Sequence, residues 1–172
     1  MTPLRQRLRA ETRPEHEALD VAFGALDLGD VHDYGLFIRA HHAAHTLIEP
    51  RIAPAPPRLA ALARDLDALG LAPLQNFDVP AIQTADPRGL AYVVAGSHLG
   101  GKILHRRWES SENAKIRAAG HYFAVPNVKE HWQITLKVLK GTTPDNHNSV
   151  VEGARSAFSC FAMALRQVKG QD

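Results

Sequence analysis

Residues 92–104, YVVAGSHLGGKIL, decide the fold because they are compatible with two different structures. As a strand, a glycine loop and a helix, Gly96 to Lys102 match the first seven positions of a phosphate-binding loop, G-x-x-x-x-G-K. As one helix, the stretch places Gly96, Gly100 and Gly101 on a single face without side chains. A flat ligand could then lie against bare backbone. The rest of the chain has to decide between these two interpretations.

The phosphate-binding interpretation fails on its context. Such a loop needs a preceding strand and a surrounding parallel sheet, and the chain shows no alternation of strands and helices. The residue after Lys102 is Ile103, where a magnesium-binding Ser or Thr hydroxyl is required. No second apolar run ends in an Asp that could hold the metal. A nucleotide-dependent enzyme is therefore the weakest of the functions considered.

Helical periodicity runs through almost the whole sequence and predicts an all-α class. Apolar residues recur at steps of three and four along residues 4–23, 34–48, 59–69, 89–108, 128–139 and 151–168. Thr12 and Glu15 form a predicted capping box, with Pro14 suited to a first helical turn. Gly70 and Gly141 are predicted helix ends, and residues 71–87 are predicted to form a long connection. We expect one multi-helical domain covering residues 1–172.

Composition limits the function classes. The 172 residues are 45% hydrophobic and carry a net charge of +2, which is typical of a soluble globular domain and too small to indicate nucleic acid as a partner. No run approaches the roughly 18 apolar residues that span a bilayer, so no membrane is expected. The single cysteine, Cys160, cannot form an internal disulfide, and we expect a cytoplasmic protein.

His16 is a candidate metal ligand. It lies on the apolar stripe that contains Leu8, Leu19 and Phe23, so it is expected to face the interior. Asp20, one turn later, can accept the second ring N–H and fix the tautomer of a ligating imidazole. From spacing alone, a structural histidine remains the stronger interpretation. Combined with a glycine-bared helix, however, His16 could form one wall of a haem slot.

At this point the sequence resembles a family. Residues 8–20, LRAETRPEHEALD, together with YVVAGSHLGGKIL, resemble the bacterial, biliverdin-producing haem oxygenases. The resemblance continues through residues 34–52, the segment around Trp132 and the Phe-rich final helix. It implies a haem-oxygenase-like all-α fold with a glycine-kinked distal helix.

The resemblance also implies roles for single residues. His16 stands at the position of the proximal iron ligand, and Gly96, Gly100 and Gly101 match the glycines of the distal helix. Basic and phenolic residues stand where the family holds the haem edge and its propionates: Arg9, Arg13 and Tyr92, with Lys102 and Arg106 as alternative cations.

The distal motif departs from part of the family. Mammalian-type members carry an aspartate after the first distal glycine, where it orders water, and this chain has Ser97. Serine and backbone groups are then expected to order that water. We expect His98 to point outward, because neighbouring residues on a helix do not face the same slot.

The implied activity is oxidative cleavage of haem, which is both cofactor and substrate. Dioxygen and electrons from an external reductase or ferredoxin would convert it to biliverdin, carbon monoxide and iron. The alternative is a haem carrier or sensor on the same fold without turnover.

The remaining aromatic residues and histidines have simpler interpretations. His41, His42 and His45 are expected to form a hydrophilic helix face. Trp132 is expected to be a core anchor, and Phe158 and Phe161 are expected to line the core or a haem pocket.

Overall fold

The computed structural model describes residues 2–55, 57–100 and 102–171, with the backbone only for residues 98–100 and 102. Within these ranges, regular structure is helical, and no strand occurs. The α-helices are α1 (Pro3–Glu11), α2 (Arg13–Gly24), α3 (Val31–Ile48), α4 (Arg58–Leu69), α5 (Pro80–Thr84), α6 (Pro87–Gly100), α7 (Lys102–Glu109), α8 (Ala114–Ala118), α9 (Val128–Lys140) and α10 (His147–Lys169). Two short 3₁₀ helices are η1 (Glu49–Arg51) and η2 (Pro144–Asn146). The all-α prediction is confirmed.

Helix ends follow the predicted local chemistry in several places. The Asp30 side chain accepts the backbone N–H of Asp33 at 3.0 Å and caps α3. Gly70 ends α4 with a left-handed φ of 69°, and Gly141 follows the last residue of α9. The predicted connection over residues 71–87 contains the short helix α5.

The capping box predicted at Thr12 is wrong. Thr12 lies between α1 and α2, and its hydroxyl donates to the carbonyl of Leu8 at 2.7 Å, backwards into α1. Its side chain makes no cap hydrogen bond to α2. The hydroxyl therefore completes the C-terminus of the first helix rather than the N-terminus of the second.

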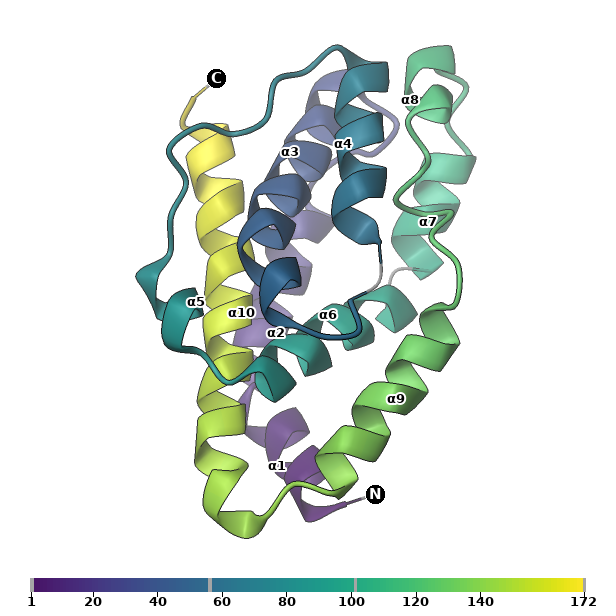
Figure 1. Cartoon of the computed structure of the whole chain (residues 1–172). Coiled ribbons are helices and arrows are strands. Elements are labelled where there is room, and N and C mark those ends of the chain that lie inside the picture. The colour runs from purple at the N-terminus through teal and green to yellow at the C-terminus, as the bar shows by residue number, and fades with distance from the viewer. Residues whose placement is uncertain (1, 56, 101, 172) are drawn as a thin grey trace.

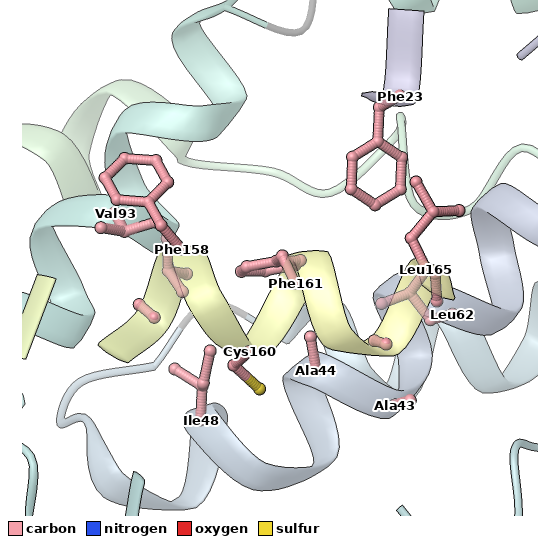
Figure 2. Close-up of a cluster of buried hydrophobic side chains, with 14 of the residues drawn as sticks. Phe23, Ala43, Ala44, Ile48, Leu62, Val93, Phe158, Cys160, Phe161 and Leu165 are labelled. Carbon is pink, nitrogen blue, oxygen red and sulfur yellow. The ribbon is translucent and has the colours of Figure 1, made fainter. Parts of the chain in front are cut away.

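Helix α10 is the centre of the packing. It contacts α6 and α3 most extensively, and also α1, α2 and α5. Figure 1 shows α6 crossing the middle of the molecule beside α10, with α3 and α4 above it and α9 below. In Figure 2, Cys160 extends from α10 toward Ile48 of α3, and Phe158 leaves the helix on the side of Val93 of α6. The two helices that matter for the site, α2 and α6, are thus both placed by α10.

The crossing of α6 and α10 is a backbone-to-backbone contact. A Cβ atom on Gly89 would lie 2.1 Å from the carbonyl oxygen of Val150, and one on Gly153 would lie 2.6 Å from that of Asp86. Glycine at both positions is therefore required for the helices to approach this closely. Asp86 adds hydrogen bonds to the Ser149 hydroxyl (2.9 Å) and the Arg88 guanidinium (2.6 Å).

The prediction of a hydrophilic face on α3 is wrong. His41 and His45 are buried, and His41 Nδ1 lies 2.9 Å from the carbonyl of Phe37. Helix α3 packs on α10 on one side and on α4 and α8 on others, so almost its whole circumference is covered. Neither charge patterning nor periodicity reveals this, because the covering elements are distant in sequence.

Among the described residues, no helix is both long and apolar enough to cross a bilayer.

Candidate functional site

His16 lies in the second turn of α2 with an accessible imidazole. Its side chain is 57% exposed, so the expectation that it faces the interior is wrong. Helix α2 packs mainly on α10, and one covering helix leaves the outer side of the ring open. The inner side meets Phe158 of α10, edge to face, with ring centroids 5.7 Å apart. His16 is therefore held from one side and open on the other.

Asp20 lies where the sequence predicts it. Its Oδ2 atom is 3.4 Å from His16 Nδ1, one turn along α2. A carboxylate beside Nδ1 favours the tautomer that leaves Nε2 as the free electron-pair donor. Within the described part of the chain, no hydrogen bond engages His16 Nε2. The arrangement can present one basic nitrogen to an incoming ligand.

The glycine-bearing part of α6 forms a second group of site residues. Tyr92 is half-buried, and its ring centroid is 5.8 Å from that of Trp132 on α9. A Cβ on Gly96, one turn later, would lie 3.6 Å from the Trp132 ring. The side of α6 at Gly96 therefore faces the ring of Trp132, which also contacts Tyr92.

The expectation that Trp132 anchors the core is wrong. The residue is half-buried at the junction of α1, α6 and α9, and the guanidinium of Arg5 lies over its ring at 5.4 Å. Sequence reasoning missed both Arg5 and Trp132 as site neighbours. The sequence does show a cluster of arginines in α1, Arg5, Arg7 and Arg9, but this cluster does not indicate which of them lies against α9.

Arg9 and Arg13 take different places. Burial raises the pKa of Tyr92, while the positive charges of Arg5 and Arg9 oppose this shift. Arg13 is 74% exposed, and its Nε donates to Glu17 at 2.6 Å. The charge of Arg9 therefore acts on the Tyr92 phenol, whereas Arg13 is paired with a carboxylate.

The remaining predicted residues lie around the end of α6. The Ser97 hydroxyl donates to the carbonyl of Val94 at 2.9 Å. Gly100 is the last residue of α6. Gly101 and the side chains of His98 and Lys102 lie outside the described residues. Phe158, on α10, is buried except for a 6% exposed fraction and is brought directly against His16.

One residue that the sequence did not single out contacts the inner side of α6. Arg58, the first residue of α4, is fully buried and donates from Nη1 to the carbonyl of Val94. Its Nε and Nη2 atoms have no hydrogen-bond partner among the described residues, and the same holds for both ring nitrogens of buried His45. A lone Arg after a proline-rich loop carries no sequence signal of burial.

Two cavities lie away from His16. One, of about 90 Å³, lies between α6 and α9 and is lined by Ala91, Val94, Ala95, Ile134 and Val138 among others. The other is an open surface hollow near residues 25–29 and 107–111. His16 lines neither of them and lies instead on the surface of α2, against Phe158 of α10.

Comparison with known proteins supports the fold and leaves the family unassigned. No protein-family model matches the chain, and no curated protein matches it either. A solved structure of a haem oxygenase from Neisseria meningitidis, determined with NO and CO bound, superposes with a TM-score of 0.74. The match covers 97% of this chain and 92% of that one, at 20% sequence identity. The chain therefore has a haem-oxygenase-like fold, as the sequence predicts.

Proposed function

We propose that the chain is a haem oxygenase, which cleaves haem with dioxygen and external electrons to biliverdin, carbon monoxide and ferrous iron. The observation that carries the proposal is His16. Its imidazole is exposed, backed by Asp20 at Nδ1 and by Phe158 on its inner edge, on a haem-oxygenase-like fold. A reductase or ferredoxin would supply the electrons.

The residues present fit a haem group. A haem needs one imidazole nitrogen for the iron, an apolar surface for the macrocycle and cations for the carboxylates. His16 Nε2 supplies the first, and Phe158 contributes to the second. Arg9 of α1 would supply a cation and Tyr92 of α6 a phenol, and the charge of Arg9 acts on that phenol. Helices α2 and α6 both pack on α10, which supports their proposed roles as the two walls of the site.

Each wall has a distinct task in the proposed reaction. His16 would bind the iron, and Asp20 would hold the imidazole in the tautomer that allows it. Gly96 and Gly100, and Gly101 by its place in the motif, would let the backbone approach the open face of the ring. Bound haem supplies the redox chemistry that activates dioxygen. The protein supplies orientation, partial exclusion of water and proton delivery.

Ser97 has a limited role in proton delivery. Its hydroxyl proton is engaged by the carbonyl of Val94, so the oxygen is left to accept hydrogen bonds from water. Protons would then arrive through water that Ser97 and the backbone hold in place. Lys102 and Arg13 are the remaining proposed cations at the haem edge.

The geometry of Ser97 also favours a second candidate, a haem carrier or sensor without turnover. A carboxylate at this position would accept several hydrogen bonds and order water strongly, whereas one committed hydroxyl orders it weakly. The two candidates share the haem site and differ only in whether bound haem is consumed.

A hemin titration with paired variants tests the site. Wild-type protein and His32→Ala, whose exposed histidine lies at the start of α3, are expected to give the same Soret band. His16→Ala is expected to lose that band or shift it, with recovery on adding free imidazole. If His16→Ala binds and degrades haem as well as the wild type does, His16 is not the iron ligand. Ascorbate in air, with catalase present to remove free peroxide, then separates turnover from storage, because an oxygenase converts the band to biliverdin absorbance and a carrier keeps it.

A further inference from the structure

Helix α7 follows the glycine stretch and turns away from α6 (Figure 1). Helix α6 is fixed by extensive packing on α10 and α9, whereas α7 has few neighbours beyond α6 and α8. Ile103, near its start, is 63% exposed. The position of α7 therefore depends on the contacts that its own described side chains make.

Trp108 is the main anchor of α7. Its Nε1 donates to the carbonyl of Ile116 at 2.9 Å. Its six-membered ring lies directly on Gly120, where a Cβ would be only 2.1 Å from Cζ2 and 2.7 Å from Cη2. Phe123 covers the ring with centroids 5.5 Å apart. The indole therefore occupies a fitted socket formed by residues 116–123.

The socket is itself held firmly by the core. The Tyr34 hydroxyl of α3 donates to the carbonyl of Ala119. The buried carboxylate of Asp65 on α4 accepts the backbone N–H groups of His121 and Tyr122, each at 2.8 Å. These bonds tie the turn to helices α3 and α4. The socket is thus a fixed reference point for α7.

Two weaker contacts also hold α7 in place. The His105 ring is parallel to that of Phe123, with centroids 5.4 Å apart and planes at 6°. Arg107 Nη1 donates to the carbonyl of Gly24 at the C-terminus of α2, 3.1 Å away. The second contact connects α7 to the helix that carries His16. His105 and Arg107 are exposed, so the partly buried anchors of α7 are Trp108 and Leu104, which both pack against the core.

We propose that Trp108 is a positioning residue for the distal wall. Seated on Gly120, it holds α7 in place, and α7 in turn would limit the movement of Gly96 and Gly100 at the end of α6. This inference rests on the proposed function for its catalytic meaning. The claim that the socket of Trp108 holds α7 in place applies to the protein without haem and does not depend on that function.

Gly120→Ala tests the proposal without replacing any residue of α7 or any proposed haem contact. Its Cβ would overlap the indole, so the ring must leave the socket. Gly141→Ala is the matched control, because its Cβ would have no heavy atom nearer than 3.7 Å. Hydrogen exchange on the haem-free protein is expected to rise at least tenfold in a peptide covering residues 97–104 of Gly120→Ala. Exchange in α3 and α10 should stay unchanged, and Gly141→Ala should match wild type.

A compensating variant makes the test specific. Phenylalanine lacks the Cζ2 and Cη2 atoms that meet the new methyl group, so Trp108→Phe should restore slow exchange in the Gly120→Ala background. In the haem-loaded enzyme, Gly120→Ala should change the ratio of biliverdin isomers, and the double variant should recover it. A general loss of folded protein would lower yield without changing that ratio. If Gly120→Ala does not fold, Trp108→Leu replaces it in both measurements.

Unchanged exchange at residues 97–104 in a folded Gly120→Ala or Trp108→Leu variant would overturn the proposal. So would an unchanged isomer ratio in an active one. If exchange at residues 97–104 rises as expected but the protein does not degrade haem, the structural role of Trp108 is supported and the proposed function is rejected.

Discussion

Arg58 and Ser97 donate hydrogen bonds to the same acceptor, the carbonyl oxygen of Val94 on α6. Arg58 reaches it from the buried side and Ser97 from the exposed side. The carbonyl lies two residues before Gly96, so both interactions act on the helix that forms the proposed distal wall. The carbonyl of Val94 thus connects a buried residue, Arg58, with a residue of the proposed site, Ser97.

Replacing Arg58 separates its volume from its charge. Burial lowers the pKa of Arg58, the charge of Glu49 opposes this shift, and two of the guanidinium nitrogens have no hydrogen-bond partner among the described residues, so the charge is only partly compensated. Arg58→Met keeps most of the volume and should change the free energy of unfolding by less than about 1 kcal/mol. Arg58→Ala leaves a cavity and should cost about 3 kcal/mol. Urea unfolding measures both, and equal losses would show that the charge itself stabilises the fold.

Gly89→Ala tests the crossing of α6 and α10. The added methyl group meets backbone atoms of Val150, Gly153 and Ala154, none of which can rotate away. We expect a loss of about 3 kcal/mol or failure to fold, measured from the urea midpoint. The control Gly141→Ala should change stability by less than about 0.5 kcal/mol. A Gly89→Ala variant as stable as this control would mean that the helices are farther apart.

Buried histidines should make the fold acid-sensitive. Burial lowers the pKa of His41 to about 3 and that of His45 well below its ordinary value, with Arg58 adding to the shift at His45. The unfolded chain then binds more protons than the folded one between about pH 6.5 and pH 3. Stability is complete above about pH 6.5 and falls as the pH decreases through this window, by up to about 1.4 kcal/mol per pH unit for each histidine.

A pair of variants isolates this effect. Chemical unfolding of His41→Phe at pH 8 and pH 5 should show a smaller loss than wild type. His32→Ala, which removes an exposed histidine, should show the same loss as wild type. Identical pH dependence in all three proteins would contradict a neutral, buried His41.

The two arginines of the haem-edge prediction should differ in effect. The positive charge of Arg9 acts on the Tyr92 phenol, whereas Arg13 is paired with Glu17 on the surface. Arg9→Ala should weaken hemin binding about three- to tenfold, the size of one partly exposed charge interaction. Arg13→Ala should change it less than about twofold. A hemin titration of both variants measures the two affinities. A larger loss of affinity in Arg13→Ala than in Arg9→Ala would contradict a propionate site at Arg9.

Much of the fold was predictable because local chemistry agrees with it. Asp30, Gly70 and Gly141 act as helix boundaries through their own side chains or their lack of one. The His16–Asp20 spacing likewise needs nothing beyond one helical turn. Such features depend on neighbours within four residues, which a sequence displays directly.

The features that were missed depend on distant parts of the chain. His41 and His45 are buried because α10, α4 and α8 enclose α3. Trp132 lies at a helix junction rather than in the core because α9 meets α1 and α6 along its side. The exposure of His16 reflects a missing second cover over α2, and the burial of Arg58 reflects where α4 begins. Periodicity indicates which face of a helix is apolar, but not what covers the others.

The most direct test of the central claim is aerobic reduction of the wild-type hemin complex. With a reductase or ascorbate supplied, we predict loss of the Soret band and growth of biliverdin absorbance. Ferrous iron and carbon monoxide should each appear in a one-to-one ratio with the haem consumed. A haem complex that forms but keeps its Soret band through repeated reduction in air would contradict oxygenase activity and leave a haem carrier.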